Sequence, residues 1–224
     1  MHRDEPVEYE PVSVKAVLAE MKDTAELLID LSYSAVLHGS PDLAAEVVAL
    51  ESRMDVLQLQ ARMSVMMAAR SPEDVEDLAP VLGVVGAAEK ISDAAGDIAK
   101  VVLEDVGLPE AMRYALPEAV ETLVRVPVAD GSPYVGRTLG EINMETETGV
   151  RVIAVRREQA TGKARWITNP DRDTDLRAGD TLILRGFEEG LREVYEAAAG
   201  EAYDPPDSPE PTVADLERAV DSIV

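Results

Sequence analysis

Cysteine is absent from this 224-residue chain, and histidine occurs only as His2 and His38. Disulfide bonds, thiolate catalysis and cysteine-liganded metal sites are therefore excluded. No Gly-x-Ser-x-Gly elbow or Walker loop occurs, and no Gly-x-Gly-x-x-Gly follows a predicted strand, so we expect neither an enzyme nor an NAD or ATP site. The alternative enzyme class is a metal hydrolase built on carboxylates, although such sites normally add histidine ligands.

Long apolar runs are also missing. The longest, PVLGVVGAA at 80–88, is far shorter than the about 20 residues that a transmembrane helix needs. The first residues, MHRDEPVEYEP, lack the apolar core of a signal peptide. We therefore expect a cytoplasmic protein that does not insert into a membrane and reaches the inner membrane face only through a partner protein.

Positive charge is scarce, because 21 basic residues stand against 44 acidic ones and the net charge is −23. Such a chain repels nucleic acid and anionic lipid at long range, so nucleic acid is not an expected partner. Lysine supplies only five of the basic residues, and phenylalanine occurs once. This composition is typical of a high-salt cytoplasm, as in halophilic archaea, where salt screens the repulsion among carboxylates.

The first half of the chain has helical periodicity. After an N-terminal tail at 1–11, apolar residues recur at spacings of three and four, and the pattern breaks at HGSPD (38–42) and RSPED (70–74). In both breaks a serine, Ser40 or Ser71, precedes a proline, as at a helix N-terminus. The sequence therefore predicts an antiparallel bundle of three helices over 12–107.

An acidic stripe runs along the predicted third helix, where Glu89, Asp93 and Asp97 are four residues apart. The stripe lies roughly opposite Ile91 and Ala95, so we expect it to face solvent or a partner. The second helix repeats the spacing with its own acidic pair, Glu51 and Asp55.

Like charges at this spacing cost about 0.2–0.5 kcal/mol per pair unless something neutralises them. A divalent or trivalent cation held by these five carboxylates would do so, and so would concentrated salt. Two interpretations stay open, namely a metal site and a solvated acidic face.

The three long helices, and AAEKISDAAGDIAKVV at 87–102 in particular, resemble PhoU domains over 12–107. These domains regulate phosphate uptake and occur fused to regulators of cation transport. Complete PhoU proteins carry two such repeats and bind metal clusters at their acidic motifs, whereas this chain has one repeat. The resemblance implies a regulatory helical domain.

The periodicity changes after a connecting helix predicted at 108–121. LVRVPV (123–128) alternates as a strand, with Pro127 favouring an edge position. Thr138 and Glu141 form the capping box of a short helix. GVRVIAVRR, ARWIT and TLILRG follow as strands, the first of them central, and FEEGLREVYEAA closes with a helix. The predicted fold class is an α-helical bundle followed by a small α/β domain ordered β-α-β-β-β-α.

G-x-T-L at 136–139, GVRVIAVRR and LRAGDTLILRG in this order resemble the TrkA C-terminal domain, also the C-terminal lobe of regulators of potassium conductance, over 122–198. The resemblance implies a homodimer with a groove for a small ligand, for example cyclic di-AMP, at its interface. We also expect a dimer because the strands carry apolar residues on both faces, more than one short helix pair covers. The acidic tail at 199–224 could add a short amphipathic helix.

An anionic ligand needs local positive charge, which guanidinium groups supply by paired hydrogen bonds. The candidate ligand residues are Arg151, Arg156, Arg157, Arg165, Asn169 and Pro170. The alternative for the arginines is salt bridges to Glu141, Glu158 or Asp175. The sequence thus predicts a regulatory subunit of a membrane cation channel or transporter, with potassium as the expected ion. A regulator of another cation, such as magnesium, and a phosphate-signalling adaptor are the alternatives.

Overall fold

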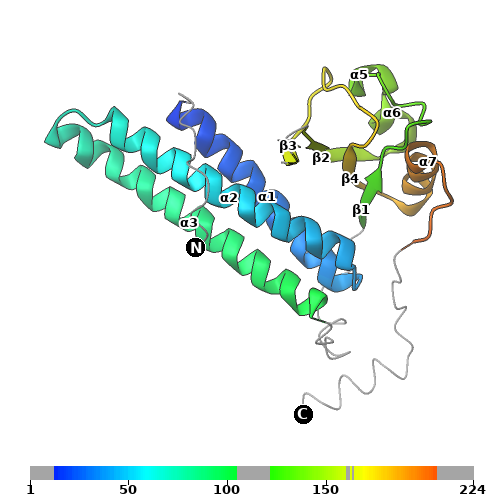
Figure 1. Cartoon of the computed structure of the whole chain (residues 1–224), viewed down its shortest axis with the longest axis horizontal. Coiled ribbons are helices and arrows are strands. Elements are labelled where there is room, and N and C mark those ends of the chain that lie inside the picture. The colour runs from blue at the N-terminus through cyan, green and yellow to red at the C-terminus, as the bar shows by residue number, and fades with distance from the viewer. Residues whose placement is uncertain (1–12, 105–121, 160–161, 163, 206–224) are drawn as a thin grey trace, which may run out of the picture.

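A computed structural model describes residues 13–104, 122–159, 162 and 164–205 of the chain. A bundle of three long helices carries a small sheet against its side, near the turn between the first two helices (Figure 1). Within the described ranges no helix is long and apolar enough to cross a bilayer. The predicted connecting helix at 108–121, the N-terminal tail and most of the acidic tail lie outside the described residues.

The bundle consists of α1 (Val14–Leu37), α2 (Pro41–Ala68) and α3 (Pro72–Leu103). Ser40 and Ser71 accept hydrogen bonds from the first-turn amides of α2 and α3, as their place before proline predicts. The bundle core is built from long aliphatic side chains that are almost completely buried, including Leu28, Leu31, Leu50, Met54 and Leu57. The predicted antiparallel three-helix bundle is confirmed.

The second domain is a four-stranded antiparallel sheet in the order β1-β4-β2-β3. Its strands are β1 (Thr122–Pro127), β2 (Arg151–Glu158), β3 (Ala164–Thr168) and β4 (Thr181–Gly186). The helices are α5 (Leu139–Ile142), α6 (Met144–Thr148) and α7 (Glu188–Ala199). The predicted edge position of β1 and interior position of β2 are confirmed, while α6 is an additional turn of helix.

The junction before α5 follows its sequence signature. Gly136 has a φ of +79°, which favours glycine, and its N–H donates to the Leu176 carbonyl at 2.8 Å. The Thr138 side chain accepts from the Glu141 amide and the Glu141 carboxylate accepts from the Thr138 amide. The reciprocal capping fixes the first turn of α5, and the Gly136 hydrogen bond ties the junction to the segment that precedes β4.

Both faces of the sheet are covered. On one face Val126, Val155 and Leu182 pack with Leu191 of α7 and Ile142 of α5. The other face contributes Leu123, Ala154, Trp166 and Ile183 to the same apolar core as α1 and α2. Our reason for expecting a dimer, namely an uncovered second face, is therefore wrong: the helical bundle of the same chain covers it.

Candidate functional site

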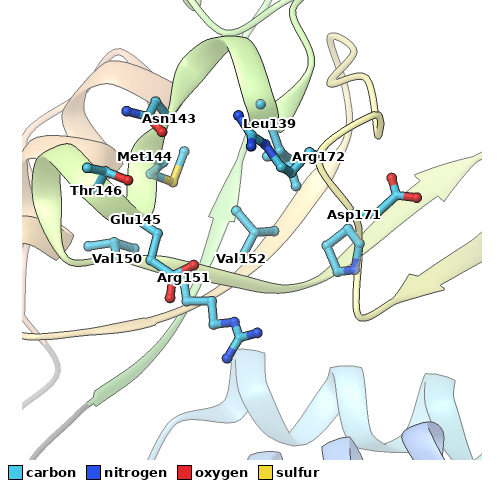
Figure 2. Close-up of a pocket in the computed structure, with 12 residues that line it drawn as sticks. Leu139, Asn143, Met144, Glu145, Thr146, Val150, Arg151, Val152, Asp171 and Arg172 are labelled. Atoms are coloured by element: carbon cyan, nitrogen blue, oxygen red, sulfur yellow. The ribbon is translucent and has the colours of Figure 1, made fainter.

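A cavity of about 450 Å³ opens where α5 and α6 meet the start of β2 (Figure 2). Its walls combine apolar and charged side chains, among them Leu139, Met144, Val152, Arg151, Arg172 and Glu145. A cavity of this size is large enough for a small organic ligand, since such sites commonly measure about 300–1,000 Å³.

Two asparagines in the left-handed region shape the cavity. Asn143, with φ of +56°, separates α5 from α6, and Asn169, with φ of +48°, turns the chain after β3. The Asn169 N–H donates to the Ile153 carbonyl, and the Gly140 N–H donates to the Arg172 carbonyl at 2.8 Å. A Cβ on Gly140 would lie 2.9 Å from that carbonyl oxygen, so glycine lets the 169–172 loop close against α5.

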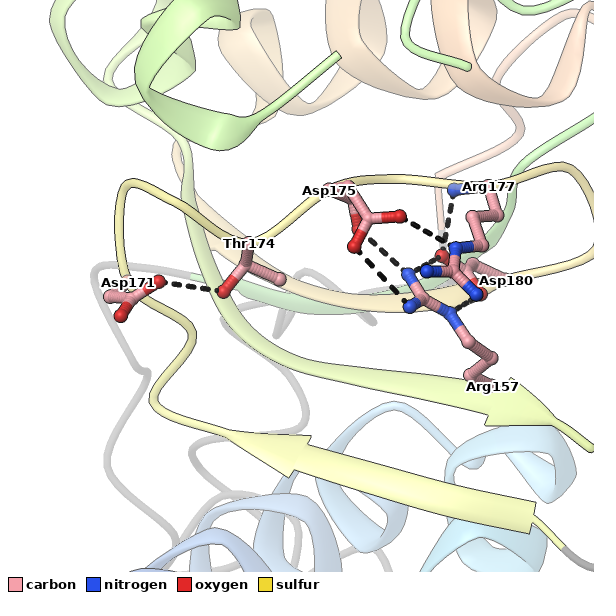
Figure 3. Close-up of polar contacts among 6 residues, drawn as sticks. All are labelled: Arg157, Asp171, Thr174, Asp175, Arg177 and Asp180. Carbon is pink, nitrogen blue, oxygen red and sulfur yellow. Dashed lines mark hydrogen bonds and ion pairs between the residues drawn. The ribbon is translucent and has the colours of Figure 1, made fainter. Parts of the chain in front are cut away.

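The cavity lining carries two arginines and two carboxylates, and no ion pair joins them within the described residues. The Arg151 and Arg172 guanidinium groups are exposed and make no ion pair or hydrogen bond within the described part of the chain. Glu145 and Asp171 also line the wall, but Asp171 Oδ1 accepts from the Asp173 amide and from the Thr174 hydroxyl at 3.0 Å (Figure 3). Two free guanidinium groups beside apolar walls suit an anion that carries a ring or base.

The predicted ligand residues do not lie together: some belong to the cavity, Arg165 lies outside it, and Arg156 and Arg157 form ion pairs elsewhere in the structure. Arg151 and Pro170 line the cavity, and Asn169 shapes it. Arg165 is exposed on β3 and is not among the lining residues. The sequence missed Arg172, because nothing in the pattern shows that its loop folds back onto α5.

The Arg157 guanidinium forms hydrogen bonds and ion pairs with other residues of the same domain (Figure 3). Its Nε and Nη2 donate to the two Asp180 carboxylate oxygens at 2.8 and 2.7 Å, and Nη2 also donates to the Asp175 carbonyl. The Asp180 side chain is only 1% exposed, and its hydrogen bond raises the pKa of the Arg157 guanidinium. The Arg177 guanidinium is the main cause of the lowered Asp175 pKa. Arg157 thus makes the salt bridge to Asp175 that the alternative interpretation predicted.

Arg156 points to the other face of the sheet, where it meets the helical bundle. Glu46 of α2, whose side chain is 5% exposed, lies between two guanidinium groups. Arg125 Nε donates to Glu46 Oε1 at 2.6 Å. Arg156 Nε lies 3.1 Å from Oε2, but the contact lacks hydrogen-bond geometry, so both atoms have no hydrogen-bond partner. Arg156 and Glu46 are thus close enough for an ion pair, but their atoms are not oriented for a hydrogen bond.

Arg185 of β4 adds a further link, an ion pair with Asp30 of α1. We use the term domain interface for these residues, Asp30, Glu46, Arg125, Arg156 and Arg185, together with the apolar contacts around Trp166. The sheet supplies the positive groups and the helices supply the negative ones. Sequence periodicity missed Glu46, although it is a carboxylate on the core-facing side of α2.

The two acidic stripes face one another across the contact between α2 and α3. Burial raises the pKa of Asp55, and the charges of Asp93 and Glu89 add to the effect. Burial also raises the pKa of Glu51, with further contributions from Asp55, Asp93 and Asp97 and an opposing one from Lys100. The prediction that Ile91 shares the buried side of α3 is wrong, because its side chain is exposed.

The five carboxylates differ in their surroundings. Within the described residues no group of three or more acidic or histidine side chains gathers closely enough to hold a metal ion. Two of the five are already paired, Glu89 with Arg62 and Asp97 with Lys100. Gly96 lies against the Glu51 carboxylate, where a Cβ would be 2.5 Å from Oε2. The arrangement is a line of charge along the contact between α2 and α3.

Known protein families match both domains. The PhoU domain model matches residues 18–102 and the TrkA-C domain model matches residues 123–199. A phosphate-specific transport system accessory protein, a PhoU homolog from Zymomonas mobilis, is 28% identical over 91 residues, which cover 39% of this chain and 38% of the relative. The chain therefore spans well under half the length of this curated relative.

Solved structures overlap with parts of the chain. The RCK_C domain dimer of S. agalactiae BusR in complex with c-di-AMP is 22% identical, with 34% of this chain and 91% of that chain covered and a TM-score of 0.29. BusR in complex with its busA-promotor DNA is 15% identical, with 63% and 64% covered and a TM-score of 0.30.

The GsuK channel bound to NAD is 20% identical, with 59% of this chain and 22% of that chain covered and a TM-score of 0.29. With scores this low, the overlays carry no argument about the ligands or partners of this chain. The domain assignment rests on the two family models and on the observed order of helices and strands. In this chain a PhoU domain is followed by a TrkA-C domain.

Proposed function

We propose that this protein is the regulatory subunit of a membrane cation channel or transporter, with potassium as the expected ion. A small phosphate-bearing ligand binds in the cavity of the TrkA-C domain, and the response passes through the domain interface to the PhoU domain. Cyclic di-AMP is the proposed ligand, because it combines phosphate groups for Arg151 and Arg172 with flat bases for the apolar wall.

The main support for this proposal is that β2 connects the cavity to the domain interface. The strand begins at the cavity with Arg151 and reaches the domain interface with Arg156. Arg151 also stands opposite Arg185, which is paired with Asp30 of α1. A ligand that draws Arg151 toward a phosphate therefore acts on a strand that contacts α2 through Arg156 and lies beside the β4 residue that contacts α1.

An irregularity in β2 supports the same route. Its register against β4 shifts between Val152 and Ala154, directly after the cavity and before the domain interface. A bulge leaves one residue out of the ladder and is a place where a strand can adjust. Together with the incomplete contact between Arg156 and Glu46, it gives the interface a second arrangement to adopt.

We also propose a homodimer. The TrkA-C resemblance supports a homodimer. The apolar second face of the sheet gives no further support, because the helical bundle of the same chain covers it. Sedimentation of the full chain at several salt concentrations tests the assembly, and a monomer at tens of micromolar would remove this part of the proposal.

Ligand sensing is tested by calorimetric titration of cyclic di-AMP into the full chain. The full chain is needed because an isolated TrkA-C domain would expose Trp166 and Ile183, which pack against the bundle. Arg151→Ala and Arg172→Ala should each weaken binding at least about tenfold, since charged hydrogen bonds contribute about 1.5–3 kcal/mol. Arg165→Ala is the matched control, an exposed arginine outside the cavity. No heat at millimolar ligand would refute the ligand proposal.

A phosphate-signalling adaptor is the second candidate, favoured by the match to an accessory protein of phosphate-specific transport. It differs from the first in its partner. Co-purification from the native host, followed by identification of the membrane protein retained, separates a cation transporter from a phosphate transporter. Promoter DNA is the ligand in one similar structure, and the net charge of −23 speaks against this partner here.

A further inference from the structure

The first thirteen residues of α3 contain apolar side chains but bury none of them. The buried residues of this helix begin only at Val85. The end of the bundle away from the sheet extends beyond the N-terminus of α1 as a hairpin of α2 and α3 (Figure 1). On this hairpin Met66 is 65% exposed, Val75 56% and Leu82 41%.

Four of the exposed apolar residues and the acidic stripes lie along the line where α2 meets α3 on one side of the hairpin, which we call the groove. Arg62 of α2 and Glu89 of α3 form an ion pair at 3.3 Å, which fixes the two helix faces that meet across it. Leu59 and Met66 share the face of Arg62, at spacings of three and four. Leu82 precedes Glu89 by seven residues, so both lie on the same face of α3.

The groove has two chemically different halves. Toward the free end of the hairpin it is apolar, with Met66, Val75 and Leu82 exposed, while Leu59 lies between Asp55 and Arg62 at the border of the two halves. Toward the sheet it is acidic, because Asp55 interacts electrostatically with Asp93 and Glu89, and Glu51 with Asp93 and Asp97. We call these residues together the outer groove. Met66 and Glu51 are about 22 Å apart along α2, at 1.5 Å per residue.

We propose that the outer groove binds a cationic amphipathic helix of a partner protein. Apolar side chains at helical spacing would cover the apolar half, and arginine or lysine side chains would neutralise the acidic half. A helix of about 18 residues has the required length. Of the five carboxylates near this half, only Glu89 and Asp97 have an ion-pair partner within the described residues, so positive side chains of a partner would find unpaired carboxylates there.

The charge of the groove decides among the occupants. An anionic lipid surface would meet the acidic half with like charge. A second copy brings another net charge of −23 and no basic half that matches the acidic one. The residues at 206–224 of the same chain carry five carboxylates and a single arginine. A basic partner segment is the occupant that complements both halves.

Which protein supplies this basic segment is inferred from the proposed function, and only this part of the proposal rests on that function. Cytoplasmic loops of membrane proteins are enriched in lysine and arginine close to their transmembrane helices. A short basic amphipathic helix of the regulated transporter is therefore the expected ligand, and the binding chemistry itself does not depend on which transporter supplies it.

The probes are two fluorescent peptides of about 18 residues. Each has leucines at helical spacing in one half and four arginines in the other. The arginine half comes first in one peptide and last in the other, so that both orientations in the groove are tested. Fluorescence anisotropy with the full chain should give a dissociation constant of about 1–100 µM for one direction. Leu82→Lys and Asp93→Asn should each weaken binding about tenfold. The matched controls are Val84→Lys, on the same turn but another face of α3, and Glu76→Gln, an exposed carboxylate outside the groove.

Several results would overturn the proposal. These are equal binding of a scrambled peptide, insensitivity to Leu82→Lys, tighter binding to phosphatidylglycerol vesicles than to peptide, and dissociation of a dimer by Leu82→Lys. Higher peptide affinity after removal of residues 206–224 would assign the groove to the tail. Leu82→Lys should leave cyclic di-AMP titration unchanged, so failure of the groove and failure of ligand sensing are distinguishable.

Discussion

Replacing Glu46 by Gln keeps the shape of the side chain but removes the only negative charge that the domain interface places between Arg125 and Arg156. The Arg125 and Arg156 side chains are 27% and 19% exposed, so two partly buried guanidinium groups would keep only the more distant, exposed carboxylates of Asp42 and Glu158, each 3.9 Å away. Removing one partner of a fully buried pair costs about 3–5 kcal/mol. Because solvent reaches both arginines, we expect about 2–3 kcal/mol.

Urea unfolding, followed through the single tryptophan, measures this loss. Trp166 lies in the apolar core shared by the sheet and the helices, so its fluorescence reports separation of the domains as well as unfolding. Asp42→Asn is the control, since Asp42 is 79% exposed and 3.9 Å from Arg125, and it should change stability by less than about 0.5 kcal/mol. If Glu46→Gln unfolds at the wild-type midpoint with an unchanged slope, the domain interface does not depend on this charge.

Further predictions concern the packing of glycines and the acidic half of the groove. Gly190→Ala should destabilise the TrkA-C domain by about 3 kcal/mol or more in urea titrations, because its Cβ would collide with the Thr148 backbone carbonyl. Gly96→Ala should cost less, about 1 kcal/mol, because the flexible Glu51 carboxylate can move aside. Asp55→Asn should raise the melting temperature at pH 7 in low salt. Since burial and the nearby Asp93 and Glu89 raise the pKa of Asp55 on folding, its charge destabilises the fold above that pKa, and the gain should vanish toward pH 4. Concentrated salt should reduce the gain without removing it, because salt screens the neighbouring charges but not the cost of burial. An equal gain at pH 4 and pH 7 would rule out this cause.

Local sequence signals determined most of the fold. Serine followed by proline marked the starts of α2 and α3, and the capping pair Thr138 and Glu141 marked α5. These features act within one turn of helix, so a pattern of a few residues is enough to identify them. The order of strands followed from alternation and from the resemblance to TrkA-C domains.

The partners of the arginines could not be predicted in the same way. Arg156 pairs with Glu46, which is in another domain, and Arg157 pairs with Asp180 across a loop. Both arginines appear identical in a strand pattern, although they point to opposite faces. The usable signal was Glu46 itself, a carboxylate three residues after Leu43 and on its side of α2, where both are buried.

The arginines of the domain interface also disfavour strands that pair in the wrong register. Arg125, Arg156 and Arg185 lie on β1, β2 and β4, which are neighbours in the sheet. All three project toward the carboxylates of the helices. A slip of one residue in any of these strands would turn a guanidinium group into the apolar layer beneath α7. Misaligned strands therefore carry a large penalty, and only one alignment lets all three arginines reach the carboxylates of the helices.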